Sequence, residues 1–135
     1  MKKPKVNQYT DNGDGTVTDN RTGLMWVRDG KSAGCNNGKI MTWKDAMKFC
    51  KELDFAEYKG WRLPTIEELQ SIVAYEKHNS AIDEAFENTK NSYYWSSTTY
   101  ASGTGYAWGV NFYSGNVNYY NKTGYDYVRP VRGGQ

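Results

Sequence analysis

The 135-residue chain predicts a single α+β domain in which two helices flank a small antiparallel sheet. Residues 9–29 place turn formers beside β-branched runs, residues 42–73 contain two capped amphipathic segments, and residues 93–132 return to a period of two. Strands at both ends with helices between them favour this layout over alternating βαβ units. No linker interrupts these segments, so we expect one domain over residues 9–133 after a flexible tail at 1–8.

Residues 9–29 are typical of a β-hairpin. The turn-rich stretch 11–15 precedes the β-branched run 16–18, and residues 20–23 turn into the apolar run 24–27. The 11–15 stretch also has the composition of a calcium loop, but an EF-hand register places Thr10 at position 1 and Arg21 at position 12. We therefore predict a turn there, no metal site and no cofactor.

Two helices are predicted between residues 42 and 73. Thr42 caps the first, whose apolar face consists of Trp43, Ala46, Met47, Cys50 and Leu53. Thr65 and Glu68 form a capping box for the second, whose stripe consists of Ile66, Leu69, Ile72 and Val73. Residues 30–41 and 76–92 are expected to be loops, the second with a short helical turn at 82–86.

The last third of the chain is predicted to form a β-meander. Trp108, Val110 and Phe112 fall on one side of a strand, and Ser114-Gly115 is expected to be a two-residue turn. Residues 116–120 then run back, and a final strand covers 125–132. The five tryptophans are expected to lie mainly in the core.

The segment 93–127 holds nine of the twelve tyrosines and only two charged side chains, among many Asn, Ser, Thr and Gly. The same composition dominates antibody binding loops, where Tyr gives contact area at low entropic cost. A Tyr-rich sheet explains part of it, but both faces beside the turns cannot be core. We therefore predict ligand-binding residues here, namely Tyr100, Ser102, Thr104, Tyr106, Tyr113, Tyr119, Tyr120, Asn121, Tyr125, Asp126 and Tyr127.

Several classes of function are poorly supported. Residues 1–90 carry fourteen basic and fourteen acidic side chains, so no basic stripe for nucleic acid is visible. No apolar run approaches 18 residues, which predicts no membrane insertion, and no signal peptide follows the first three residues. His78 is the single histidine and lacks partners for a triad or a zinc site, so we predict a protein that is not an enzyme. Cys35 and Cys50 are compatible with a disulfide or with free thiols.

Five motifs, at 11–26, 60–65, 68–73, 94–101 and 127–133, resemble the Lcl C-terminal domain family, named for a Legionella collagen-like adhesin. The resemblance implies a C-type-lectin-like fold in which the N- and C-terminal strands pair. It also implies an extracellular or cell-surface location and, as partner, a protein or glycan on another cell or particle. A cytoplasmic location stays open, as does the choice between a monomer and a trimer.

The resemblance leads to three readings of function. In the first, the chain is the variable protein of a diversity-generating retroelement, with Tyr119, Tyr120, Asn121, Gly124, Tyr125 and Asp126 where relatives are Asn-rich. In the second, it is an adhesin that binds sulfated polysaccharides through Lys122, Arg129, Arg132 and the N-terminal lysines. The third, an enzyme like the formylglycine-generating enzymes, lacks their C-terminal cysteine pair, because no Cys follows Cys50.

Two departures from relatives qualify this resemblance. Relatives often carry Cys where this chain has Pro130, so Cys50 is expected to pair with Cys35 in an oxidising compartment. The calcium-site signatures of sugar-binding C-type lectins are absent, so calcium-dependent monosaccharide binding is not implied.

Overall fold

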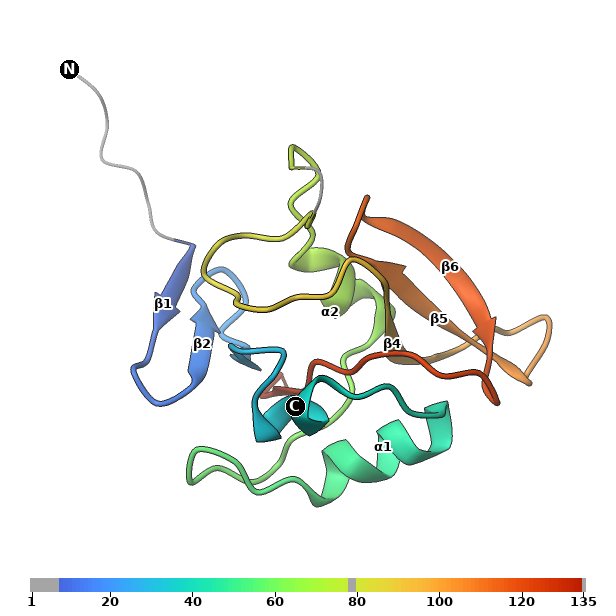
Figure 1. Cartoon of the computed structure of the whole chain (residues 1–135), viewed down its shortest axis with the longest axis horizontal. Helices are drawn as coiled ribbons and strands as arrows, with labels where there is room; N and C mark the ends of the chain where they lie inside the picture. The colour runs from blue at the N-terminus through green and yellow to red at the C-terminus, as the bar shows by residue number, and fades with distance from the viewer. Residues whose placement is uncertain (1–7, 78–79, 135) are drawn as a thin grey trace.

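The structure, a computed structural model, describes residues 8–77 and 80–134 and contains two small antiparallel sheets with helices packed between and beneath them (Figure 1). The predicted α+β class is confirmed, and the arrangement is consistent with a C-type-lectin-like fold. His78 and all of the predicted tail except Gln8 lie outside the described residues.

The N-terminal sheet has the order β1-β2-β3-β7 and consists of β1 (Tyr9–Asp11), β2 (Thr16–Asp19), β3 (Met25–Val27) and β7 (Val131–Arg132). The predicted turn between its first strands is confirmed, since Asp11 Oδ1 accepts a hydrogen bond from the Gly13 N–H at 3.0 Å. β7 pairs with β3, with Trp26 opposite Val131. The C-terminal strand therefore closes onto the N-terminal hairpin, as the resemblance implied.

The helices begin where their caps predict. Helix α1 (Trp43–Glu52) follows Thr42, whose Oγ1 accepts from the Asp45 N–H at 3.3 Å. Helix α2 (Ile66–Ser71) has the full capping box, in which Thr65 and Glu68 bond each other's main-chain N–H. The first stretch expected to be a loop, residues 30–41, contains the 3₁₀ segment η1 (Ala33–Gly38). At 82–86, where a short helical turn was expected, the chain makes one turn that is not part of a helix. The Phe86 N–H closes it by donating to Asp83 O at 3.0 Å.

The C-terminal sheet has the order β4-β5-β6 and consists of β4 (Tyr93–Thr99), β5 (Tyr106–Asn111) and β6 (Asn116–Asn121). The predicted length of the turn at Ser114-Gly115 is wrong. The turn covers four residues, 112–115, and the Gly115 N–H donates to Asn111 O. Phe112 therefore leaves the strand but stays fully buried in the core. The expected final strand is shorter than predicted, since only Val131 and Arg132 belong to β7.

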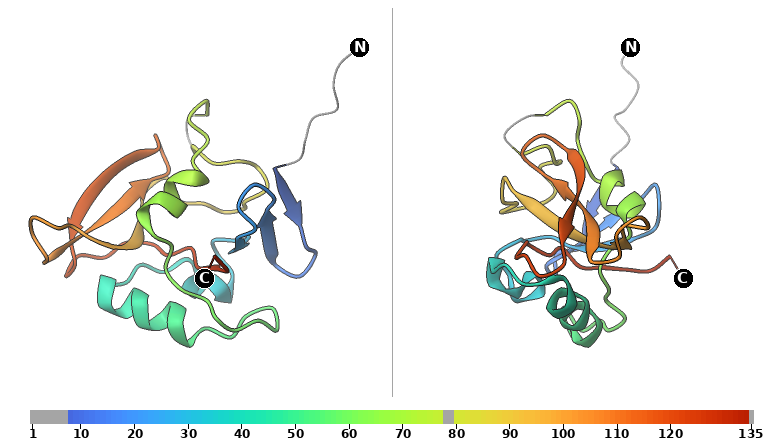
Figure 2. Two further views of the ribbon diagram at one scale, coloured as in Figure 1. Left: turned by 180° about the vertical axis from the view of Figure 1, so that it is seen from behind. Right: turned by 90° about the vertical axis from the view of Figure 1, so that its right-hand side faces the viewer.

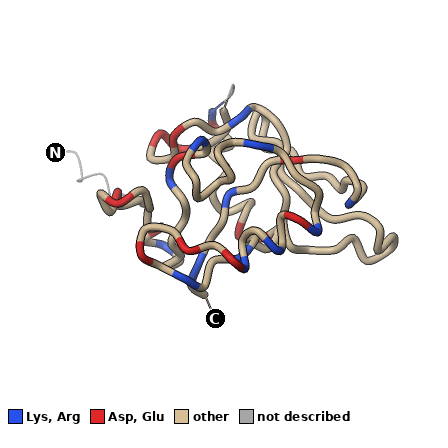
Figure 3. Tube along the Cα trace, turned by 60° about the horizontal axis from the view of Figure 1, so that its bottom comes forward, with Lys and Arg blue, Asp and Glu red and all other residues tan. Residues whose placement is uncertain are grey.

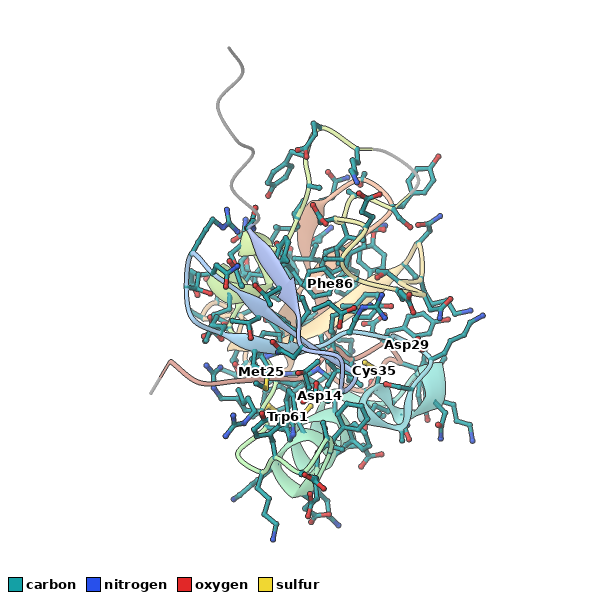
Figure 4. All side chains as sticks on the ribbon, turned by 90° about the vertical axis from the view of Figure 1, so that its left-hand side faces the viewer. Asp14, Met25, Asp29, Cys35, Trp61 and Phe86 are labelled. Atoms are coloured by element: carbon teal, nitrogen blue, oxygen red, sulfur yellow. The ribbon has the colours of Figure 1, made fainter. Side chains whose placement is uncertain are left out.

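Three hydrophobic clusters form the core. The first lies between the two sheets and α2, the second between α1 and the C-terminal sheet, and the third below the N-terminal sheet. Figure 2 shows the two sheets at opposite ends of the molecule. Figure 4 shows Met25, Cys35 and Trp61 of the third cluster close together. Trp26, Trp61 and Trp95 are buried as expected, whereas Trp43 and Trp108 are half-buried at cluster edges.

Arg129 is fully buried, which corrects its expected place on a polyanion-binding surface. Its Nη1 donates to Val27 O at 2.7 Å and to Arg28 O at 2.9 Å, and its Nη2 donates to Thr89 Oγ1 at 2.7 Å. The guanidinium also lies 5.2 Å from the centre of the Phe86 ring. Arg129 thus joins the β3 end to the 87–89 segment and is unavailable to a ligand.

Cys35 and Cys50 are buried free thiols in the structure, in place of the expected disulfide. Cys35 packs in the third cluster beside Trp61, and Cys50 packs in the second cluster on the buried face of α1. Burial raises the pKa of Cys35 to about 11 and also raises that of Cys50. Both side chains therefore behave as small apolar groups of the core.

Candidate ligand-binding surface

The C-terminal sheet has two different faces because successive strand residues point to opposite sides. Trp95, Ala107 and Tyr120 face α1 and belong to the second cluster. Tyr94, Val110 and Val117 face α2 and belong to the first cluster. At the end of the sheet beyond α2, the second face carries four aromatic rings, of which two are exposed and two are half-buried.

These rings form one contact network, here called the aromatic face and made of Tyr100, Tyr106, Trp108 and Tyr119. Trp108 and Tyr119 are direct cross-strand neighbours with ring centroids 5.5 Å apart. Tyr100 stacks on Tyr119 at 4.1 Å and 4°, and its ring meets Trp108 edge-on at 5.3 Å. Tyr106 meets Tyr119 edge-on at 5.8 Å and is 40% exposed, while Tyr119 is 41% exposed. Such stacked and edge-on pairs each contribute about 0.5–1.5 kcal/mol beyond burial.

The loop that carries Tyr100 is closed by its own hydrogen bonds. The Tyr100 N–H donates to Tyr106 O at 2.8 Å, and the Tyr106 N–H donates back to Gly103 O at 2.9 Å. A Cβ at Gly103 would lie 3.4 Å from the Tyr106 ring and 3.5 Å from the Tyr100 ring, so the small residue sits against both. Ser102 and Thr104 are exposed on the same loop. The aromatic face is therefore held in place before any ligand arrives.

The remaining predicted site residues separate into other environments. Tyr113 is 51% exposed but lies in the turn at the opposite end of the β5–β6 hairpin. Tyr120 packs against Tyr93 on the α1 face with ring centroids 4.1 Å apart, and Tyr127 packs on Tyr94 at 5.5 Å. Tyr125 is 64% exposed in the connection after β6. The eleven predicted residues therefore do not form one surface.

Asn121 and Asp126 have structural contacts of their own. Asn121 Oδ1 accepts from the Thr123 N–H at 3.0 Å and from the Thr123 hydroxyl at 2.8 Å, which closes the turn after β6. Asp126 exchanges two main-chain hydrogen bonds with Met41, each 3.0 Å long. Desolvation by burial raises the pKa of the Asp126 carboxyl to about 7.

A second feature, which the sequence prediction missed, is a shallow groove of about 970 Å³ between α1 and the 60–65 connector. Lys44, Lys48 and Lys51 are exposed along its helix side, and Met47 and Leu63 contribute to its lining. The spacing of these lysines, four and then three residues, is the sequence signal for one helix face. Figure 3 shows α1 with its charged residues and the C-terminal sheet almost free of them.

Arg62 also lines the groove but is already paired. Its Nη1 lies 2.7 Å from Glu68 Oε1, and its Nη2 donates to Gly133 O at 2.7 Å. Although desolvation opposes it, the Arg62 guanidinium lowers the pKa of Glu68 and helps to keep this carboxylate ionised. The groove therefore offers three exposed ammonium groups, the exposed carboxylate of Glu52 and one guanidinium whose charge is largely compensated.

The α+β fold therefore presents a preformed, partly exposed aromatic surface on its C-terminal sheet. The Lcl C-terminal domain model matches residues 15–132, so the chain belongs to the Lcl C-terminal domain family. This adhesin-type family comprises ligand-binding domains of the cell surface or the extracellular space. No curated protein matches the chain.

Two features are absent from the part of the chain that the structure describes. None of the helices there is both long and apolar enough to cross a bilayer. No group of three or more His, Cys, Asp and Glu side chains in residues 8–77 and 80–134 could hold a metal ion.

Proposed function

We propose that the chain binds a protein or glycan on another cell or particle through the aromatic face, without catalysing a reaction. The observation that carries this proposal is the rigid stack of Tyr100 on Tyr119 beside two further rings, with Tyr106 and Tyr119 both well exposed. Exposed aromatic rings bury large area at low entropic cost in an interface, and their hydroxyl groups supply hydrogen bonds.

The test compares two pairs of exposed tyrosines. The variant Tyr106→Ala/Tyr119→Ala removes two rings of the aromatic face, and the control Tyr113→Ala/Tyr125→Ala removes two exposed rings outside it. Binding is measured on a glycan array and on whole bacterial and host cells. We expect at least about a tenfold loss for the first variant, corresponding to about 1.4 kcal/mol, and little change for the control. Equal losses in both variants would contradict the proposal.

The variable-protein reading is a finer proposal for the same surface. Tyr119, Asn121 and Tyr125 are exposed, so their side chains can change without opening the core. Tyr120 is half-buried against the second cluster, which makes it a poor position for diversification. A neighbouring reverse transcriptase gene, with a near-copy of the 3′ coding region that differs only at adenines, is the expected observation. If the genome holds neither the reverse transcriptase gene nor the near-copy, the variable-protein reading is wrong and the adhesin reading, with a constant surface, stands.

A second candidate function is the binding of a sulfated polysaccharide, and the groove beside α1 favours it. Lys44, Lys48 and Lys51 span about 10 Å along the helix, so they present a row of charge to a linear polyanion. We expect binding to heparin that weakens steeply with salt and decreases several-fold in Lys48→Glu. The control Lys39→Glu reverses an exposed lysine outside the groove. Salt-insensitive heparin binding would argue against this candidate.

A further inference from the structure

Strand β6 is an open edge of the C-terminal sheet. In an antiparallel ladder, alternate residues direct their N–H and C=O groups toward opposite neighbours. The Lys122 N–H donates to Gly105 O at 2.9 Å, so Tyr120 and Asn118 also face β5. The main-chain groups of the alternate residues, Val117, Tyr119 and Asn121, therefore point away from β5. Asn121 O already accepts one hydrogen bond from the Gly124 N–H at 2.8 Å and has a second lone pair for a partner. Figure 1 shows β6 at the outer rim of the C-terminal sheet, where it is the last strand in the order β4-β5-β6.

The other sheet edges are covered or short. The outer edge of β4 is bonded by two segments, because the Trp95 N–H donates to Tyr127 O and the Ser97 N–H donates to Pro64 O. β7 is covered by residue 62, which bridges Val131. β1 has only three residues, and one of them is charged. Within residues 8–77 and 80–134, β6 is therefore the longest uncovered edge.

β6 also lacks the features that usually protect an edge strand. Its six residues, Asn116–Asn121, include no charge and no proline, and they pair with β5 without a bulge. Natural edges are commonly blunted by Lys, Pro or bulges because an open edge templates pairing with another strand. The Tyr119 N–H is bonded only locally, by Asn118 Oδ1 at 2.8 Å. A partner strand can replace that contact without disturbing the β5–β6 ladder.

We propose that β6 joins two copies of this chain through an antiparallel contact with the β6 strand of the second copy. A two-fold axis at Tyr119 sets the outward main-chain groups of Tyr119 against those of its copy. The same register places Val117 opposite Asn121, so the three outward-facing residues of each strand bond one another. The resulting contact is isologous and extends the sheet from three strands to six.

The chemistry of the strand favours a second copy over a charged peptide. An uncharged strand meets its own copy without like-charge repulsion, whereas an acidic or basic segment finds no complementary charge on β6. In the proposed register, Asn118 lies opposite Tyr120, whose ring stays packed against Tyr93 on the α1 face. The rings of the two Tyr119 residues fall on the same side of the joined sheet. Two aromatic faces thus become one continuous surface.

Self-association is tested first by sedimentation. Stable interfaces bury about 1,200–2,000 Å² or more, and a contact of one six-residue strand per copy is smaller, so we expect a weak dimer. The mass should rise from 15.4 kDa toward twice that value as the concentration increases from about 10 μM to about 1 mM. Asn118→Lys, an edge charge that leaves the aromatic face intact, should abolish the rise. A wild-type monomer throughout, a trimer, or an undiminished dimer in Asn118→Lys would overturn the proposal.

Two further measurements locate the contact. Tyr119→Cys should form a disulfide-linked dimer under mild oxidation, because hydrogen-bonded antiparallel partners lie about 5.5 Å apart between Cα atoms. Tyr113→Cys, equally accessible but in the turn, should not. Amide exchange at Val117 and Tyr119 should slow as concentration rises, while exchange at Asn118 should not change. Cross-linking of both variants to the same extent, or concentration-independent exchange, would place the contact elsewhere.

Discussion

Tyr100 and Tyr119 stack ring on ring, with centroids 4.1 Å apart and planes 4° from parallel. The first residue follows β4 and the second belongs to β6, so the stack spans the width of the three-stranded sheet. Because β5 lies between the two strands, the stack depends on the register that places Trp108 opposite Tyr119. The stack thus links the loop between β4 and β5 to the edge strand β6.

The stack should have a measurable coupling energy. In a double-mutant cycle of Tyr100→Ala and Tyr119→Ala, we expect the two losses of unfolding free energy to be non-additive by about 0.5–1.5 kcal/mol. Urea unfolding of the four proteins measures it. Losses that add to within about 0.3 kcal/mol would show that the rings do not interact in solution.

Replacing Arg129 should destabilise the protein strongly. Arg129→Ala removes a fully buried side chain and leaves Val27 O and Arg28 O without this donor, which together cost about 3 kcal/mol or more. Arg132→Ala, a control that removes a half-buried Arg lying over the Tyr58 ring, should cost about 1 kcal/mol. Chemical unfolding compares the two, and similar losses would contradict a structural role for Arg129.

Two glycines of the β4–β5 hairpin, Gly105 and Gly109, should respond differently to replacement by alanine. A Cβ at Gly109 would lie 2.7 Å from Tyr94 O and 3.5 Å from the Tyr120 ring, so Gly109→Ala should cost about 1–3 kcal/mol. Nothing lies within 4 Å of a Cβ at Gly105, so Gly105→Ala should be neutral or slightly stabilising. Thermal melting of both variants is the measurement, and equal melting temperatures would be inconsistent with the close approach at Gly109.

Asp126 should make stability depend on pH. Its carboxyl has a pKa of about 7 in the folded protein and about 3.9 when unfolded, so the folded state binds more protons between these values. Stability should therefore decrease as pH rises through this window and level off above it. Asp126→Asn should be more stable than the wild type, by a larger margin at pH 8 than at pH 5, and the difference should vanish below about pH 4. A difference between the two proteins that is independent of pH would contradict the raised pKa.

The two thiols should be inert in the folded protein. Because both are buried and the pKa of Cys35 is raised to about 11, a thiol reagent at pH 8 should label neither without denaturant and both in guanidinium. Mass spectrometry of protein purified without reductant checks the alternative. A mass lower by two hydrogens, with no labelling after unfolding, would restore the disulfide expected from the resemblance.

Local sequence signals were sufficient for most elements. The capping residues Thr42 and Thr65 mark the true starts of α1 and α2, since a cap depends only on atoms within a few residues. The β5–β6 turn was predicted at Ser114-Gly115 but its length was wrong, because the structure extends it back to Phe112, whose ring is held in the core. A tertiary contact, not the turn residues alone, decides where that strand ends.

By itself, the sequence determined the α+β class, the family and the Tyr-rich segment that carries the exposed rings, because composition, periodicity and motifs are local properties. Only the tertiary structure decided which tyrosines form a surface. Tyr119 and Tyr120 are adjacent and identical, yet one lies on the aromatic face and the other packs toward α1, because successive strand residues point to opposite sides. The same is true of Arg129, whose burial depends on carbonyl groups about one hundred residues away in the chain.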